Sequence, residues 1–193
     1  PVRLDITDEA SIKEALNLII KKENRIDVLV NNAGYGSYGA VEDVRIEEAK
    51  MQFEVNIFGL ARLTQLVLPY MRKQKSGRII NVGSMGGRLT SYFGAWYHAT
   101  KYALEAFSDG LRMEVADFGI DVSIIEPGGI KTDWGFIAAD KLAESAKGGA
   151  YEAAATKAAE GMRKQYSGNM MSNPKVISNA ISKAVNSRCP KTR

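Results

Sequence analysis

Three polar side chains near the middle of the sequence have the types and the spacing needed to move a proton. Ser84 follows a short apolar run that predicts a buried strand, and a helical pattern begins near Ala95. Tyr97 and Lys101 lie four residues apart on that helix and therefore share one face. An ammonium about 4 Å from a tyrosine lowers its pKa by up to about three units. We predict that Tyr97 has a pKa near neutrality and acts as a general acid and base, with Ser84 hydrogen-bonded to the substrate oxygen.

The elements around this trio predict an α/β fold. Apolar runs at residues 26–31, 79–82 and 120–126 are typical of parallel strands buried on both faces, and helical patterns separate them. An open α/β sheet binds ligands outside the carboxyl ends of its strands, which is where Ser84 would lie. We therefore predict a Rossmann-like, doubly wound parallel sheet.

Residues 46–75 predict one long helix, interrupted near Pro69. Its apolar residues leave little polar face, so we expect burial on nearly all sides, one of them against another subunit. Asn56 lies inside this apolar surround and needs hydrogen-bond partners there. Both a satisfied core asparagine and a catalytic one fit this position.

The last third of the sequence predicts three more helices. Residues 134–168 carry two helical patterns, which are separated at Gly148 and Gly149. A final helix begins with Asn173 as its cap and Pro174 in its first turn. The apolar residues expected to face inward on this helix are Val176, Ile177, Ala180, Ile181 and Ala184.

Several motifs resemble those of the classical short-chain dehydrogenases/reductases, in the same order and with the same spacing. They are Asn31-Asn32-Ala33-Gly34, Asn56, Ser84, Tyr97-x-x-x-Lys101 and Pro127-Gly128-x-x-x-Thr132. In that family they correspond to the N-N-A-G at the end of the fourth strand, the catalytic asparagine, the active-site segment and the loop on the nicotinamide side. The resemblance covers nearly the whole chain.

The resemblance implies an NAD(P)-dependent oxidoreductase that transfers a hydride between nicotinamide and an alcohol or carbonyl substrate. It implies that Asn56, Ser84, Tyr97 and Lys101 are catalytic. Lys101 would hold the cofactor ribose and lower the pKa of Tyr97, and Asn56 would hold a water that relays protons to Lys101. The expected cofactor is NAD or NADP, with NADP favoured.

The resemblance also implies a set of cofactor-binding residues: Asp5, Asn31, Ala33, Gly34, Tyr97, Lys101, Pro127, Gly128, Ile130 and Thr132. Asp5 lies near the carboxyl end of a strand expected at residues 2–6 and would lie beside the adenine ring. A turn aspartate ahead of a helix capped by Asp8 or Ser11 is the other interpretation. Backbone groups at residues 128–130 could bond a carboxamide, and Thr132 a diphosphate.

Members of this family have a first strand, a T-G-x-x-x-G-x-G turn and a second strand before the matched segment, and a final strand after it. Residues 1–30 contain nothing that resembles the turn, which cradles a diphosphate at a helix N-terminus. We therefore expect residues 1–193 to be a partial domain of a longer enzyme, with residues 134–168 as a helical substrate lid. Gly34-x-Gly36-x-x-Gly39 spells G-x-G-x-x-G, but no helix opens on it, so we interpret it as a loop.

The composition is that of an ordinary globular domain, and it limits the classes of molecule that the protein is expected to bind. The 193 residues are 45% hydrophobic and 25% charged, and the net charge of +4 comes from basic residues interspersed with acids. We therefore expect a protein that binds no nucleic acid. The use of a single cysteine makes a cytoplasmic setting the default, and we expect a homodimer or homotetramer at full length. No apolar run is long enough for a membrane span. Cys189, the only cysteine, excludes an internal disulfide and a cysteine metal cluster.

Other functions are compatible with parts of the same sequence pattern. Ser84 lacks the G-x-S-x-G context of a serine hydrolase. A sugar-nucleotide epimerase also uses Y-x-x-x-K, but the N-N-A-G and P-G-x-x-x-T motifs favour the first family. A catalytically inactive truncated chain that senses nucleotides or binds a partner is the alternative function. His98, the only histidine, lies about 100° around the helix from Tyr97 and is expected to be a bystander.

Overall fold

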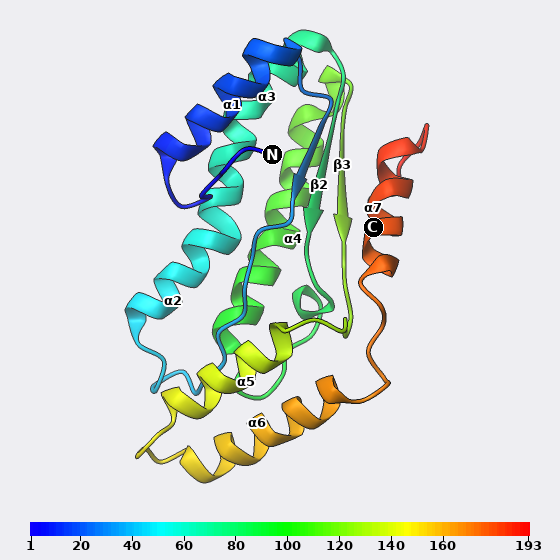
Figure 1. Cartoon of the computed structure of the whole chain (residues 1–193). Coiled ribbons are helices and arrows are strands. Elements are labelled where there is room, and N and C mark those ends of the chain that lie inside the picture. Colours follow the sequence, from blue (N-terminus) through cyan, green and yellow to red (C-terminus); the bar gives the residue numbers. More distant parts are fainter.

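A parallel sheet of three strands forms the centre of the computed structural model, which describes residues 1–193 (Figure 1). The strands are β1 (Val28–Asn31), β2 (Gly77–Val82) and β3 (Ile120–Ile125), in the order β1-β2-β3. The central strand pairs in parallel register on both sides, so that Ile80 lies between Val30 and Ser123. The predicted Rossmann-like α/β fold class is confirmed.

Helices cover both faces of this sheet (Figure 1). On one face lie α3 (Leu60–Gln74) and α4 (Ala95–Val115), with α1 (Glu9–Glu23) packed beside α3. The other face is covered by α7 (Lys175–Asn186). One apolar cluster joins the sheet to the first group of helices, and its buried members are Leu16, Leu29, Val67, Met71, Ile79, Leu111, Val115, Ile120 and Val122.

The final helix packs more loosely than its apolar stripe predicts. Asn173 caps it as expected, because its Oδ1 accepts the Lys175 amide at 2.8 Å. However, α7 buries none of its residues, and Val176 is 55% exposed. The prediction that the whole stripe faces inward is therefore wrong for Val176. The other stripe residues are half-buried.

The predicted long helix is interrupted at a different place from the one expected. It consists of α2 (Ile46–Phe53), a π-helical segment η1 (Glu54–Gly59) and α3, and Pro69 lies inside α3 without breaking it. One side is open within this chain, since Phe58 is 56% exposed. Because the expectation gave one side of the helix to another subunit, burial on nearly all sides stays a prediction.

The N-terminal segment is not the strand that its apolar residues predict. β1 pairs only with β2, and residues 1–5 are exposed without a partner strand. The backbone of Ile6 instead lies against Gly59, where an added Cβ would come within 2.5 Å of the Ile6 carbonyl oxygen. A strand needs a neighbour for its backbone groups, and this segment has none. The next helix, α1, begins as predicted, with Asp8 Oδ1 accepting the Ala10 amide at 2.9 Å.

Two further helices lie beyond the carboxyl ends of the strands (Figure 1). They are α5 (Trp134–Ser145) and α6 (Glu152–Ser167), and the break between them at Gly148 and Gly149 is as predicted. Their small residues pack closely on a second apolar cluster, whose buried members are Tyr38, Ala40, Phe93, Tyr97, Ala138, Ala139, Leu142, Ala146, Ala155 and Ala159. Because Tyr97 belongs to this cluster, the α5–α6 pair is packed directly onto a predicted catalytic residue.

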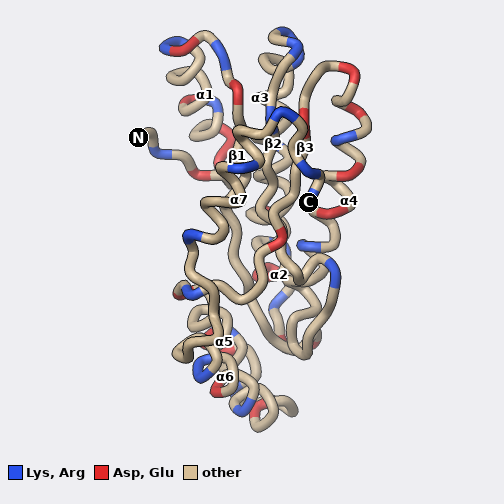
Figure 2. The backbone as a smooth tube through the Cα atoms, turned by 90° about the vertical axis from the view of Figure 1, so that its right-hand side faces the viewer, with Lys and Arg blue, Asp and Glu red and all other residues tan.

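The C-terminal residues lie along the free edge of β3. The Ile124 amide donates to the Thr192 carbonyl at 2.9 Å, and Arg193 forms ion pairs with Glu105 and Asp109. Lys and Arg are interspersed with Asp and Glu along the backbone, as the sequence indicates (Figure 2). None of the helices is long and apolar enough to cross a lipid bilayer.

Candidate active site

A pocket of about 700 Å³ opens at the carboxyl ends of the strands. Its wall is made by the ends of β2 and β3, the loop after β1, and residues from α4 to α7. The pocket brings together most of the predicted site residues: Gly34, Ser84, Tyr97, Lys101, Pro127, Gly128, Ile130 and Thr132.

Ser84 is held in the lining of this pocket by the turn that follows β2. Its hydroxyl oxygen accepts the Gly86 amide at 3.0 Å and so caps the short 3₁₀ helix η2 (Met85–Gly87). The preceding Gly83 is required by close packing, because a Cβ there would lie 2.9 Å from the Ile124 side chain. Since the Gly86 amide uses an acceptor site, the hydroxyl hydrogen of Ser84 remains available to a ligand.

Tyr97 is buried among aromatic rings. Its ring centroid lies 5.7 Å from that of Tyr38 and 5.2 Å from that of Trp134. Burial raises the pKa of Tyr97 to about 12, and the nearby Ser84 hydroxyl offsets only part of this rise. The prediction that its pKa falls toward neutrality is therefore wrong for this structure.

Lys101 explains why that prediction fails. Its Nζ donates to the Val82 carbonyl at 3.1 Å and lies 6.0 Å from the centroid of the Tyr97 ring. The lysine is itself buried, and this desolvation lowers its pKa to about 8, although the Glu105 carboxylate acts in the opposite direction. An ammonium has three N–H donors, so two remain for a ligand.

Asn56 holds the loop after β1 rather than lining the pocket. Its Oδ1 accepts the Tyr35 amide at 3.1 Å, and its Nδ2 donates to the Tyr35 carbonyl at 2.9 Å and to Thr100 Oγ1 at 3.0 Å. Both amide hydrogens are thus used by protein groups. The water relay expected of Asn56 would have to use other atoms of this residue.

Gln52 repeats this arrangement one turn earlier and was missed by sequence reasoning. Its side-chain amide accepts from the Ser37 amide at 3.0 Å and donates to the Ser37 carbonyl at 3.3 Å. Gln52 and Asn56 therefore bind alternate residues of an extended loop, much as a neighbouring strand would. No sequence signal distinguishes Gln52 from an ordinary buried glutamine.

Three predicted cofactor residues lie outside the pocket lining. Asn31 is buried and donates from its Nδ2 to Asn81 Oδ1 at 2.9 Å and to Thr64 Oγ1 at 3.2 Å. Ala33 is exposed, whereas its neighbour Asn32 lines the pocket. Asp5 accepts from Thr7 in an exposed turn, and these hydrogen bonds lower its pKa. The turn interpretation of Asp5 thus matches its observed contacts.

The loop after β3 presents free backbone groups to the pocket. Ser172 bonds to the Gly129 carbonyl and accepts the Lys131 amide, each at 2.9 Å. The amides of Gly128 and Ile130, in contrast, make no hydrogen bond within the chain. These two N–H groups lie where the sequence predicts carboxamide binding. Thr132 also lines the pocket, and its hydroxyl oxygen accepts the Trp134 amide at 3.4 Å.

His98 supports one wall of the pocket. Its Nε2 accepts the Ser91 amide at 3.0 Å, so its Nδ1 carries the proton and donates to the Gly86 carbonyl at 2.9 Å. The ring thereby ties the loop after Ser84 to α4. We assign it a positioning role that sequence reasoning did not foresee.

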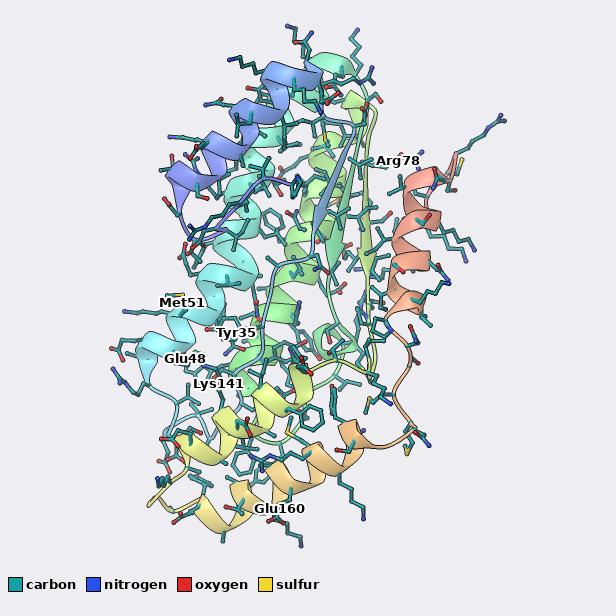
Figure 3. The ribbon with its side chains drawn as sticks, in the orientation of Figure 1. Tyr35, Glu48, Met51, Arg78, Lys141 and Glu160 are labelled. Atoms are coloured by element: carbon teal, nitrogen blue, oxygen red, sulfur yellow. The ribbon has the colours of Figure 1, made fainter.

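An ion pair joins α2 to α5 beside the pocket. Lys141 Nζ lies 2.7 Å from Glu48 Oε1 and 5.4 Å from the centroid of the Tyr35 ring, which lines the pocket (Figure 3). Burial and the adjacent Glu48 carboxylate raise the pKa of Tyr35 to about 12. These three residues come from distant parts of the sequence, so their contact could not be predicted from spacing.

Comparison with known proteins identifies the family of this chain. Residues 1–141 match the family model for short-chain dehydrogenases. Oxidoreductase BOA17 of Botryotinia fuckeliana is 39% identical over 193 residues, which is the whole of this chain and 69% of that protein.

Solved structures of dehydrogenases are also similar to this chain. A short-chain dehydrogenase from Streptomyces avermitilis is 45% identical with a TM-score of 0.65, over 67% of this chain and 48% of that one. The closed form of a serine dehydrogenase complexed with NADP⁺ is 27% identical with a TM-score of 0.79, over 95% of this chain and 68% of that one. The chain thus spans between about half and two thirds of these relatives. It belongs to the short-chain dehydrogenase family of oxidoreductases.

Proposed function

We propose that this chain carries the catalytic and substrate-binding part of an NAD(P)-dependent enzyme that interconverts an alcohol and a carbonyl compound. The observation that carries the proposal is the convergence of Ser84, Tyr97 and Lys101 on one pocket at the ends of β2 and β3. Ligands bind at this edge in open α/β sheets.

The chain's own residues would handle the proton. In the reducing direction, a carbonyl, NAD(P)H and a proton give an alcohol and NAD(P)⁺, with the cofactor supplying the hydride. The Tyr97 hydroxyl would donate the proton to the carbonyl oxygen, while Ser84 hydrogen-bonds the same oxygen. A raised pKa keeps Tyr97 protonated at neutral pH, which favours its use as the acid.

Several groups of the pocket fit the nicotinamide end of the cofactor. The unpaired amides of Gly128 and Ile130 suit a carboxamide, and the two unused donors of Lys101 suit ribose hydroxyls. Gly34 lines the same pocket and packs closely on Asn56, since an added Cβ would lie 3.1 Å from Asn56 Oδ1. We keep both NAD and NADP as cofactors.

We further propose that the α5–α6 pair is a substrate lid, because Trp134, Gln165 and Tyr166 from this pair line the pocket. A homodimer or homotetramer of the complete protein is also proposed. The exposed apolar side chains of Met51 and Phe58 on α2 and η1 support such an assembly.

The direct test is the substitution Tyr97→Phe in the complete protein, with turnover followed by the change in NAD(P)H absorbance. Loss of the acid–base hydroxyl should reduce kcat at least about 100-fold. The control is Tyr92→Phe, because Tyr92 is exposed and does not line the pocket. Unchanged turnover in Tyr97→Phe would rule out its role, and cofactor binding without any turnover in the unmodified protein would favour the nucleotide-sensing alternative.

A further inference from the structure

The pocket has two walls of different chemistry. The wall at the sheet is largely backbone and glycine, with Gly34, Gly83, Gly128 and Gly129 among its residues. The opposite wall is formed by the rings of Tyr38, Tyr97, Trp134 and Tyr166. Because Tyr97 is itself part of this second wall, a substrate that reaches its hydroxyl must pack against aromatic rings.

Trp134 is the centre of the aromatic wall. Its ring centroid lies 5.2 Å from Tyr97, 5.9 Å from Tyr38 and 6.2 Å from Tyr166. These separations are within the range of attractive ring–ring packing. The Tyr38 and Trp134 rings meet edge to face at 89°.

Two glycines make room for this wall and fix its position. A Cβ at Gly36 would lie 2.4 Å from the Trp134 ring, and a Cβ at Gly135 would lie 2.3 Å from the Tyr166 ring. Neither glycine has a positive φ, so close packing rather than backbone conformation requires them. The rings are therefore held against the backbone instead of swinging freely in the pocket.

The charge of the pocket restricts what it can bind. Lys101 is the only side chain with a formal charge in the lining, and its ammonium lies beside Tyr97 at the sheet wall. The aromatic wall contains no carboxylate and no guanidinium. A charged substrate group placed against it would lose its hydration without gaining a counter-ion, which is strongly unfavourable.

We propose that the substrate is an uncharged secondary alcohol or ketone that carries a flat apolar ring, and that Trp134 is the residue that selects it by packing against that ring. This inference rests on the proposed function, because it concerns the same pocket. It adds the substrate class and a specificity-determining residue.

Binding can be measured without hydride transfer, because the chain has only two tryptophans. The variant Trp96→Phe leaves Trp134 as the only tryptophan of residues 1–193, and the part of a fluorescence change that is lost on adding Trp134→Phe is the part that Trp134 reports. We would titrate the complete protein carrying this substitution with 1-phenylethanol, with mandelate and with xylitol. Mandelate keeps the ring but has a carboxylate in place of the methyl group, and xylitol keeps the secondary alcohols but has no ring.

We expect 1-phenylethanol to change Trp134 fluorescence and to bind at least about tenfold more tightly than either other compound. Trp134→Ala should weaken the binding of 1-phenylethanol about tenfold, measured by calorimetry. The control Tyr92→Ala removes a ring that is 69% exposed and outside the pocket, and it should leave that binding unchanged. If Trp134→Ala does not fold, Tyr166→Leu tests the same wall, with a smaller expected loss.

Equal or tighter binding of mandelate or xylitol would overturn the proposal, as would the absence of any fluorescence change with 1-phenylethanol. The proposed function fails independently: a protein that binds 1-phenylethanol at Trp134 but never reduces NAD(P)⁺ with any alcohol contradicts the oxidoreductase activity alone. A protein that turns over xylitol but not 1-phenylethanol contradicts the substrate class alone.

Discussion

The two walls of the pocket are held in place by different forces. At the sheet wall, polar groups are fixed by hydrogen bonds: Ser84 to Gly86, Lys101 to Val82, and Asn31 to Asn81 beneath them. At the aromatic wall, Trp134 and Tyr166 are fixed by close contact with glycines. The first wall depends on donors and acceptors, and the second depends on shape.

This difference separates positions that should be sensitive to polarity from those that should be sensitive to volume. A substitution that removes a buried polar partner should damage the sheet wall and the stability of the fold together. A substitution that adds a single methyl group should move the aromatic wall while leaving the fold intact. The following predictions test this contrast.

The largest effect is expected from Asn81→Leu, beneath the sheet wall. Asn81 is fully buried, accepts from Asn31 Nδ2 at 2.9 Å and donates to Ser108 Oγ at 2.8 Å. Its replacement removes one hydrogen bond each from the buried Asn31 amide and the buried Ser108 hydroxyl, which should lower the free energy of unfolding by about 3 kcal/mol. Urea denaturation measures this loss. The control Asn186→Leu lies on the exposed end of α7 and should change stability by less than about 0.5 kcal/mol.

A smaller effect should appear in the pH dependence of stability, through Lys101. Burial lowers the pKa of Lys101 from 10.5 to about 8. Between these values the unfolded chain binds a proton that the folded chain has released, so the free energy of unfolding should rise with pH. From pH 8 to pH 10 this contribution is about 2 kcal/mol. It should disappear in Lys101→Met, and identical pH profiles for the two proteins would contradict the buried environment of this lysine.

The smallest effect is expected from Gly36→Ala at the aromatic wall. The new Cβ would meet the Trp134 ring at 2.4 Å and displace it. We expect binding of 1-phenylethanol to weaken about tenfold with little change in Tm. Gly161→Ala is the matched control, because its Cβ would meet no atom within 4 Å in the middle of α6. That control should stabilise the protein by roughly 0.5–1 kcal/mol, and a similar loss of binding in both variants would refute the volume effect.

The sequence predicted the sheet wall well because strand ends and helical spacing are local patterns. The apolar run before Ser84 and the four-residue spacing of Tyr97 and Lys101 are sufficient to place them at one edge. The contacts that fix Lys101 are not local. Its ammonium donates to Val82 on another element. Burial, which also depends on distant segments, raises the pKa of Tyr97, whereas the spacing of Tyr97 and Lys101 predicted a lowered pKa.

The aromatic wall was not predicted because it joins distant segments. Tyr38, Tyr97, Trp134 and Tyr166 have no common periodicity, and they meet only after α5 and α6 fold across the end of the sheet. The strand predicted at the N-terminus is absent from the structure for a related reason. The apolar residues of the segment 2–6 satisfy strand propensity, but a strand also needs a neighbour, and propensity cannot supply one.

The π-helical segment η1 sets the rotational phase between α2 and α3. A π-turn accommodates one more residue than an α-turn, and each residue of a helix advances about 100° around its axis. If Glu54–Gly59 wound as a regular α-helix without losing a residue, the faces of α3 would be rotated by about that angle relative to α2. Gln52 could then hold the loop after β1 only if Val67 and Met71 turned away from the sheet. The π-helical segment therefore sets the rotation at which Gln52 of α2 faces the active-site loop while Val67 and Met71 of α3 face the hydrophobic core.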